Sequence, residues 1–355
     1  MLSTELRVEI DEVIHIPKLS ICIATYNRGK FISETLESIL PQLCDNVELL
    51  ILDGASPDNT RDVVFESTKH IHNVKYIRES INSGVDRDYD KVVGYAKGKY
   101  CWLMTDDDLL HPDAVRRVLR ELDKSPELVV VNAEVKNVDF SKTLTERQLN
   151  ITVDQTYNSL TSEQFFYECI GYLSFIGGIV ISRDVWMSRD REKYYGTLFI
   201  HIGVIFQGPP IVSVHVISDP LVIIRYGNAM WTGKMFEIWA FKWPNLVWSF
   251  GSFSDEAKRR VCQFAPWKNI KTLIYYRAAG AYSTREYEML ISNKTPLIDK
   301  VLPKIIAHIP GQFLVFISML ILTFFKTRVG TLKFDLVHSK YTNSTLRFFA
   351  RTIWK

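Results

Sequence analysis

The chain has 355 residues, of which 47% are hydrophobic, so it is long and apolar enough to bury a core, and global disorder is excluded. This length allows one large domain with an appendage or two smaller domains. The formal charge of +3 is too small to indicate a nucleic-acid partner. The five cysteines are widely spaced and include no CxxC pair, so we expect reduced side chains in a reducing compartment and no zinc site.

Short apolar runs alternate with helical patterns in the first 132 residues. The runs that we expect to be strands are Leu19–Ala24, Val47–Leu52, Val74–Ile77, Tyr100–Met104 and Leu128–Val131. The amphipathic stretches between them include Phe31–Leu40, Asp58–Thr68 and Pro112–Leu122. Near-continuous apolar strands separated by helices predict a mainly parallel sheet covered on both faces. Right-handed crossovers then give a doubly wound, Rossmann-like α/β fold.

The later part of the chain is less regular. Ile176–Ser182 has the pattern of another strand, and residues 226–290 are rich in aromatic side chains. Ile305–Phe325 is largely apolar, but only Phe313–Phe325 is uninterrupted, and as a helix it spans roughly 20 Å of the ~30 Å hydrocarbon core. Two interpretations stay open for it: a re-entrant or interfacial membrane helix, and a buried core helix. The basic tail that follows favours contact with an anionic membrane surface.

Polar residues follow three of the predicted strands at the point where each strand ends. They are Thr25-Tyr26-Asn27-Arg28, Asp53-Gly54-Ala55-Ser56 and Thr105-Asp106-Asp107-Asp108. Ligands of open α/β sheets bind outside the carboxyl ends of the strands, so these three loops predict a site at one edge of the sheet. A dehydrogenase would carry G-x-G-x-x-G after its first strand, and this chain has Thr-Tyr-Asn-Arg-Gly-Lys there.

The aspartate triplet indicates a cation site. Asp108 on its own is explained as a cap for the helix that begins near Pro112, but capping does not explain three adjacent carboxylates after a buried strand. Adjacent carboxylates repel each other unless a cation lies between them, and Mg²⁺ or Mn²⁺ held in this way completes its shell with substrate phosphates. Asp53 has two open interpretations, a turn residue before Gly54 and a partner of a nucleotide base or ribose.

Three segments together resemble the family-2 glycosyltransferases of the GT-A fold. They read LSICIATYNRGKFISETLESIL, VELLILDGASPDNT and NSGVDRDYDKVVGYAKGKYCWLMTDDDLLHPDAV, and they cover roughly residues 18–122. The third segment is most similar to bacterial O-antigen and other surface-polysaccharide transferases of the abequosyltransferase type. The resemblance implies a nucleotide-sugar donor and a Mn²⁺ or Mg²⁺ cofactor.

The resemblance also implies roles for matching residues on the donor side. Thr25, Tyr26, Asn27 and Arg28 would line the nucleotide pocket, Asp53 would hold the base, Asp106 would contact the ribose, and Asp107 would bind the metal, with Asp108 sharing it. Many relatives read D-x-D-D, and here Thr105 takes the first position. Where relatives carry an Arg-Asn pair after N-x-G, this chain has Tyr89 and Asp90, so Asp86 or Arg87 is expected to contact the donor.

The catalytic base is the least defined part of the predicted site. Transfer with inversion needs a carboxylate or histidine that deprotonates the acceptor hydroxyl. The acidic pair that relatives supply after the strand at Ile176–Ser182 is absent, and His201 is the nearest titratable group. A lone histidine in an apolar stretch is more often structural, so Glu168 and Glu192 are held as alternatives. Trp231, in a polar setting, is the residue expected to contact the acceptor.

These features combine into one functional hypothesis. The domains expected are a GT-A domain at residues 1–225, with a nucleotide-binding half (18–132) and an acceptor half (133–225), and a helical region at residues 226–355 with a membrane-associating segment (305–325). The acceptor would be a saccharide or a polyprenyl-linked saccharide. No signal peptide is visible, so we expect a cytoplasmic enzyme, peripheral on the inner membrane. The alternative is a catalytically degenerate scaffold subunit of a polysaccharide assembly complex.

Overall fold

The computed structural model describes residues 16–228, 230, 232–324 and 330–354. Within this part of the chain, ten strands form one sheet in the order β3-β2-β1-β4-β9-β6-β10-β5, with β7 paired to β6 and β8 paired to β10. The strands are β1 (Leu19–Thr25), β2 (Val47–Asp53), β3 (Val74–Arg78), β4 (Tyr100–Met104), β5 (Leu109–Leu110), β6 (Leu128–Asn137), β7 (Thr143–Thr145), β8 (Gln155–Asn158), β9 (Ile179–Ser182) and β10 (Ser213–Tyr226).

The sheet is mainly parallel, as predicted. β3, β2, β1 and β4 are parallel neighbours, and β10 runs parallel to β6. β9 lies antiparallel between β4 and β6 and joins the two parallel groups. The predicted strand at Ile176–Ser182 is therefore real in its second half, while residues 176–178 form a 3₁₀ turn.

Helices cover both faces of the sheet. They are α1 (Ile32–Ile39), α2 (Thr60–Thr68), α3 (Val85–Tyr95), α4 (Ala114–Leu122), α5 (Ser162–Leu173), α6 (Arg183–Met187) and α7 (Ile200–Phe206). Successive side chains of a strand point to opposite faces. Ile21 and Ile23 of β1 accordingly pack in one core with α1, α2 and α4. Cys22 between them packs in a second core with α3, α5 and α7.

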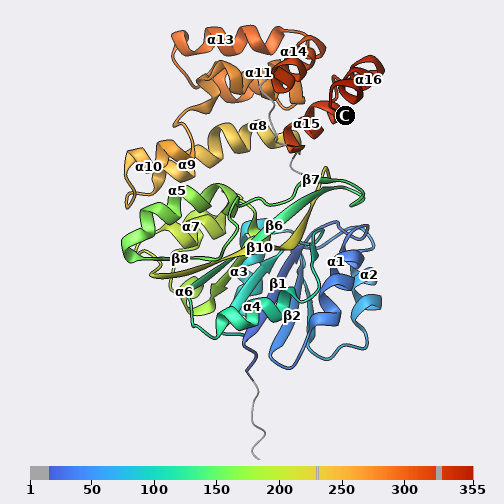
Figure 1. Cartoon of the computed structure of the whole chain (residues 1–355), viewed down its shortest axis with the longest axis vertical. Coiled ribbons are helices and arrows are strands. Elements are labelled where there is room, and N and C mark those ends of the chain that lie inside the picture. The colour runs from blue at the N-terminus through green and yellow to red at the C-terminus, as the bar shows by residue number, and fades with distance from the viewer. Residues whose placement is uncertain (1–15, 229, 231, 325–329, 355) are drawn as a thin grey trace, which may run out of the picture.

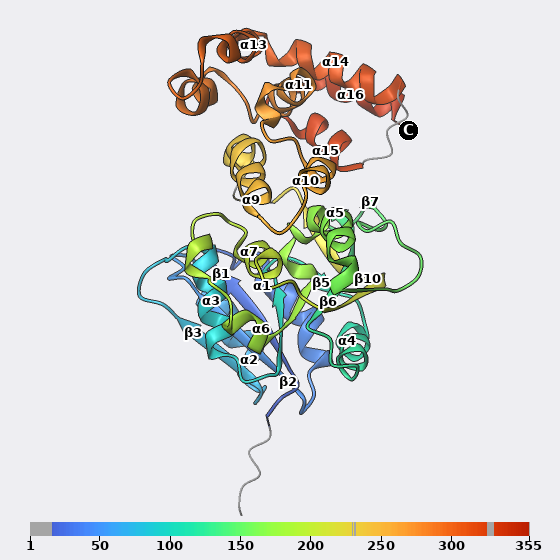
Figure 2. The ribbon, with the colours of Figure 1, turned by 90° about the vertical axis from the view of Figure 1, so that its left-hand side faces the viewer.

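A layer of helices follows β10 and lies above the sheet-containing part in both ribbon views (Figures 1 and 2). Its helices are α8 (Met235–Glu237), α9 (Trp243–Ser249), α10 (Asp255–Val261), α11 (Ile270–Ala279), α12 (Thr284–Tyr287), α13 (Leu297–His308), α14 (Gly311–Phe324), α15 (Gly330–His338) and α16 (Ser344–Ile353). Much of the aromatic-rich segment packs inside the protein, where Trp243 and Trp267 are buried. The domain division at residue 225 stays a prediction.

The apolar segment near the C-terminus forms parts of two helices, α13 and α14. In the described ranges no single helix is long and apolar enough to cross a bilayer, but α13 and α14 together reach the required length and hydropathy, with a bend of 96° between them. Leu314, Val315 and Met319 of α14 are buried in the helical layer, while Phe313 and Phe324 are exposed. One face of α14 is thus buried against the other helices of the layer, and the other face is exposed.

Asp335 of α15 connects the helical layer to the end of β10. Its carboxylate accepts hydrogen bonds from Tyr226 Oη at 2.9 Å and from Tyr275 Oη of α11 at 2.6 Å. Both tyrosine rings are largely buried, which raises the pKa of each hydroxyl. The carboxylate therefore accepts from two largely buried donors, one on each side of the contact between β10 and the helical layer.

We expect Asp335→Ala to lower the free energy of unfolding by about 2–3 kcal/mol, because two hydroxyls are left without their acceptor. Urea denaturation followed by tryptophan fluorescence measures this loss. Asp299→Ala is the matched control, because Asp299 forms a surface ion pair with Lys268 and such pairs contribute at most about 1 kcal/mol. Equal losses in the two variants would contradict the role given to Asp335.

Candidate active site

The carboxyl ends of β1, β2 and β4 meet at one edge of the sheet. β1 lies between β2 and β4, and both neighbours are parallel to it, so the loops that follow these three strands are adjacent. Arg28, three residues past β1, places Nε 3.3 Å from Asp106 Oδ1 and Nη2 3.3 Å from Asp107 Oδ2. The predicted convergence of the first and third loops is therefore present in the structure.

Asp106 and Asp107 form the charged centre of this edge. Burial, with the neighbouring Asp107 charge, raises the pKa of Asp106 to about 7, while the Arg28 guanidinium opposes this shift. Asp107 Oδ2 also accepts a hydrogen bond from Asn228 Nδ2 at 2.7 Å. Two carboxylates that face a single guanidinium are a donor set suited to a hard divalent cation, which prefers oxygen ligands.

Asp108 has a different environment from its two neighbours. Its Oδ2 accepts from Thr105 Oγ1 and its Oδ1 accepts from the backbone N–H of Arg225 at 2.7 Å. The side chain is almost fully buried, and burial raises its pKa well above the ordinary range. Asp108 thus ties the loop after β4 to the end of β10, and both of its oxygens are engaged within the protein.

Arg225, near the end of β10, connects the loop after β4 to α1 and to the end of β6. Its Nε donates to the Asp107 carbonyl at 2.8 Å, its Nη1 donates to the Val138 carbonyl at 2.7 Å, and its Nη2 pairs with Glu34 of α1. The guanidinium lies 4.1 Å from the centre of the Phe140 ring. Arg225 is therefore an anchor of the site, not a free cation.

Asp53 is fully buried and holds the loop that follows β2. Oδ1 accepts from the Ser56 N–H at 2.7 Å, and Oδ2 accepts from Tyr76 Oη at 2.5 Å. Ser56 Oγ in turn accepts from the backbone N–H of Asn27, which has a left-handed φ of 59°. This arrangement favours the turn interpretation of Asp53, which shapes the loop that carries Asn27 and Arg28.

Asp86 and Arg87, at the start of α3, face residues 195–200. Asp86 is buried and its carboxylate accepts from the backbone N–H groups of Gly196, Leu198 and Ile200, at 2.8 to 3.1 Å. Arg87 is exposed, with its guanidinium 4.5 Å from the centre of the Tyr195 ring. Asp86 therefore organises the loop before α7, and a direct contact of Asp86 with the donor stays a prediction.

The two catalytic candidates lie in unlike places. His201 of α7 is buried, and burial lowers its pKa to about 3, so its imidazole is neutral and a much weaker base than the prediction assumed. Glu168 of α5 accepts from Tyr157 Oη, and Tyr157 pairs with Val214 at the start of β10. Val214 and Arg225 pair with Leu128 and Lys136, which are eight residues apart on β6, so the two positions are roughly 26 Å apart at about 3.3 Å per residue. Glu168 thus lies toward the opposite end of β10, and a catalytic role for it stays a prediction.

Asn228 is a site residue that the sequence did not single out. Besides its bond to Asp107, its carbonyl accepts from Arg28 Nη1 at 3.3 Å. The sequence signal was its polar setting after a long strand, which by itself indicates only a loop. Trp231, the predicted acceptor contact, lies outside the described residues, as do Lys326 and Arg328 of the basic tail.

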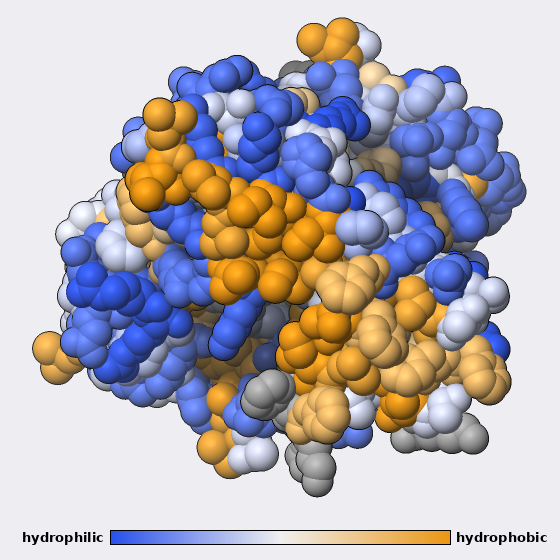
Figure 3. Space-filling model, turned by 90° about the horizontal axis from the view of Figure 1, so that it is seen from above, coloured by the Kyte–Doolittle hydropathy of each residue, from blue (hydrophilic) through white to orange (hydrophobic). Residues whose placement is uncertain are grey.

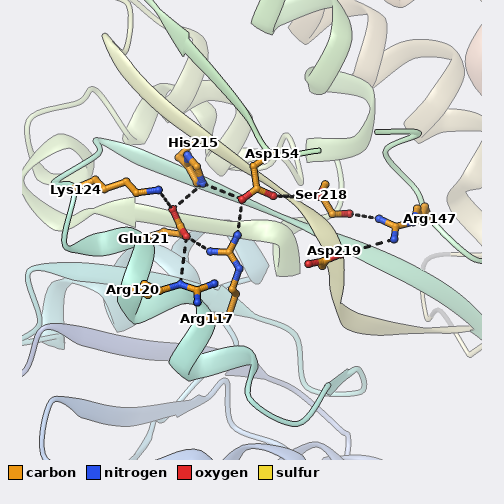
Figure 4. A network of polar contacts seen from close by, with 9 residues as sticks. All are labelled: Arg117, Arg120, Glu121, Lys124, Arg147, Asp154, His215, Ser218 and Asp219. Carbon is orange, nitrogen blue, oxygen red and sulfur yellow. Dashed lines mark hydrogen bonds and ion pairs between the residues drawn. The ribbon is translucent and has the colours of Figure 1, made fainter. Parts of the chain in front are cut away.

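A second acidic group lies at the opposite end of β10. Glu121 of α4, Asp154 and His215 of β10 bring their ligand atoms within 4.8 Å of one another (Figure 4). Arg117 pairs with both carboxylates, and Lys124 Nζ lies 2.5 Å from Glu121 Oε2. Because cationic side chains already neutralise this cluster, its chemistry fits a structural link between α4 and β10 better than a metal centre.

The sequence of this chain is similar to those of known glycosyltransferases. Residues 20–185 match the model for Glycosyl transferase family 2. The abequosyltransferase RfbV of Salmonella typhimurium is 30% identical to the chain over 224 residues, which are 59% of this chain and 67% of that protein. The chondroitin synthase of Escherichia coli is 31% identical over 133 residues, 38% of this chain and 19% of the synthase.

The fold has solved counterparts as well. Residues 1–349 of TarS from S. aureus, crystallised with UDP-GlcNAc, superpose with a TM-score of 0.51 at 13% identity, over 94% of this chain and 92% of that one. This likeness extends over the α/β part and the helical layer and shows a common architecture. With the GT-A fold, the family match and the extent of the likeness to RfbV, the chain belongs to the family-2 glycosyltransferases and is an enzyme of that class.

Proposed function

We propose that this chain transfers a sugar from a nucleotide-sugar donor to a hydroxyl of a lipid-linked saccharide acceptor in the synthesis of a bacterial surface polysaccharide, assisted by Mn²⁺ or Mg²⁺. The observation that carries the proposal is the convergence of Asp106, Asp107 and Arg28 at the carboxyl edge of the sheet. The names of the relatives, an abequosyltransferase and a chondroitin synthase, support the class of reaction and its place in polysaccharide synthesis.

On the donor side, we assign the metal to Asp107, with Asp106 beside it. When bound, the ion would supply Lewis-acid stabilisation of the departing diphosphate. Arg28 adds a positive charge within reach of the same place. We assign the nucleotide to the loop that carries it, with Thr25, Tyr26 and Asn27. Asp108, whose oxygens are occupied by Thr105 and Arg225, is better suited to hold the loop than to share the ion.

On the acceptor side, we propose that the helical layer lies against the membrane that carries the acceptor lipid. Leu297 and Ile298 of α13 are 81% and 83% exposed, and Phe313 and Phe324 of α14 are also exposed. Seen from above, hydrophobic side chains form a broad patch on the helical layer (Figure 3). Exposed Lys304 of α13 adds a cation of the kind that anionic lipids attract.

Asp107→Ala tests the donor site. With CDP, UDP, GDP and dTDP as probes, we expect one of them to bind the wild-type protein in calorimetry with Mn²⁺, and the variant to bind it roughly 100-fold more weakly, about 2.8 kcal/mol. Asp123→Ala removes an exposed aspartate far from the site and should bind as the wild type does. If no diphosphate binds the folded wild-type protein, the transferase assignment of the site fails and the scaffold hypothesis takes its place.

Substitutions on α13 test the membrane face. Leu297→Glu with Ile298→Glu should reduce binding to sedimented vesicles of phosphatidylethanolamine and phosphatidylglycerol more than tenfold, because burial of two such side chains contributes roughly 3 kcal/mol or more. The matched control is Leu160→Glu, since Leu160 is 93% exposed on the α/β part, outside this face. Binding that survives in the double variant would exclude α13 as the contact.

The pH dependence of stability tests whether His201 is suited to be a base. Its folded pKa of about 3 lies below the ordinary unfolded value of about 6.5, so the unfolded chain binds an extra proton between these values. The contribution of His201 to stability is complete above pH 6.5 and falls by up to about 1.4 kcal/mol per unit below it.

Between pH 7 and pH 5 we therefore expect the free energy of unfolding of His201→Leu to fall by about 2 kcal/mol less than that of the wild type, as measured by urea unfolding. The exposed His72→Leu variant should keep the slope of the wild type. If the stability of His201→Leu changes with pH as that of the wild type does, the imidazole titrates normally in the folded protein, and His201 is again a candidate for the catalytic base.

A further inference from the structure

The guanidinium of Arg28 lies where two carboxylates need a cation. Its Nε, Nη2 and Nη1 are each 3.3 Å from an oxygen, on Asp106, Asp107 and the Asn228 carbonyl respectively. A single planar group thus bridges two different side chains, the same pair that we assign to the metal. The side chain is only 11% exposed, so solvent gives little competing stabilisation.

These contacts are long for their kind. Charge-assisted hydrogen bonds between guanidinium and carboxylate are usually about 2.7–2.9 Å long. Arg28 Nε, although buried, has no oxygen in hydrogen-bonding geometry. By contrast, Arg225 in the same corner donates at 2.8 and 2.7 Å to carbonyl oxygens. Arg28 is therefore held mainly by charge and is the more easily displaced of the two.

The backbone beneath Arg28 is fixed, so its side chain is the part that can move. The Arg28 N–H donates to Thr60 Oγ1 at 2.9 Å, and the Gly29 N–H donates to Asp58 Oδ2 at 2.9 Å. Both acceptors lie at the start of α2 or just before it. Displacement of the guanidinium requires only side-chain rotation, because the loop stays in place.

We propose that Arg28 is an exchangeable internal counter-ion of the donor site. Its guanidinium neutralises Asp106 and Asp107 until metal and nucleotide arrive together, then passes from the carboxylates to the diphosphate. The inference rests on the proposed donor site and adds that metal and nucleotide bind to it together. Metal alone must expel the guanidinium from both carboxylates and leaves it only the neutral Asn228 carbonyl and the Phe31 ring, whereas metal with a diphosphate offers it two phosphate groups.

This exchange makes metal and nucleotide binding cooperative. By linkage, each ligand must strengthen the other by the same factor, and that factor contains the free energy of moving Arg28 from carboxylate to phosphate. Asn228 takes part, because its carbonyl contacts Arg28 and its amide contacts Asp107. Displacement of Arg28 therefore also loosens the contact with the residues that follow β10.

The test is a Mn²⁺ titration followed by electron paramagnetic resonance at pH 8, without nucleotide and with saturating CDP, UDP, GDP or dTDP in turn. For Arg28→Gln we expect Mn²⁺ alone to bind roughly tenfold more tightly than in the wild type, and the diphosphate with Mn²⁺ to bind roughly tenfold more weakly, within the usual range of coupling between sites. Arg28→Lys keeps the charge without the planar fork and should lie between the two.

Lys30→Gln is the matched control, because Lys30 is an exposed cation two residues away that contacts neither carboxylate in the described structure. It should leave both affinities as in the wild type. Unchanged Mn²⁺ affinity in both Arg28→Gln and Arg28→Lys, with circular dichroism as in the wild type, would overturn the counter-ion and leave the donor site intact. Absence of Mn²⁺ binding in every protein with every diphosphate would overturn the metal-assisted function itself.

Discussion

Three adjacent carboxylates directly after a buried strand are the constraint around which this corner of the protein is built. Asp106, Asp107 and Asp108 cannot all be buried with charge unless each finds a partner. Asp106 and Asp107 share Arg28, and Asp108 takes the Thr105 hydroxyl and the Arg225 N–H. The loops after β1 and β4 and the end of β10 are held together because these charges must be satisfied.

The same constraint connects the site to the helical layer. Arg225 and Tyr226 are consecutive residues at the end of β10, and the first contacts Asp107 while the second contacts Asp335 of α15. Successive residues of a strand point to opposite faces, so this short stretch contacts both the site and the layer above it. These contacts, together with the packing of α9 and α10 in one core with α5 and α7, hold the proposed membrane face in place relative to the donor site.

The sequence allowed the N-terminal half of the fold to be predicted well. β1, β2 and β4 are buried on both faces and therefore read as apolar runs, and their predicted bounds differ from the observed ones by one residue at most. β10 was missed, although it is the longest strand described, because His215, Ser218 and Asp219 interrupt its apolar pattern and the register shifts between Ile217 and Val222.

The site was predicted less completely than the strands, because the sequence does not show which groups surround a side chain. Residue type and loop position indicated that Asp53, Asp86 and Asp106 lie near the carboxyl edge, but not where their oxygens point. The carboxylate oxygens of Asp53 and Asp86 accept hydrogen bonds from other groups of the protein. All of these donors but the Tyr76 hydroxyl are backbone N–H groups, and the sequence does not show where a backbone N–H group will lie. The ordinary pKa assumed for His201 failed for a similar reason, since burial depends on the whole fold.

Two clusters of the same residue types then show why charge balance, and not composition, separates a site from a structural link. At the start of β10, Glu121 and Asp154 meet the cations Arg117 and Lys124, and the ion pair between Lys124 Nζ and Glu121 Oε2 is 2.5 Å long. At the carboxyl edge, two carboxylates meet one guanidinium at 3.3 Å. The first cluster has its cations built in at close range, so a metal would have to displace several of them. The second is under-neutralised and loosely held, and that deficit is the property a site for a divalent cation and a diphosphate requires.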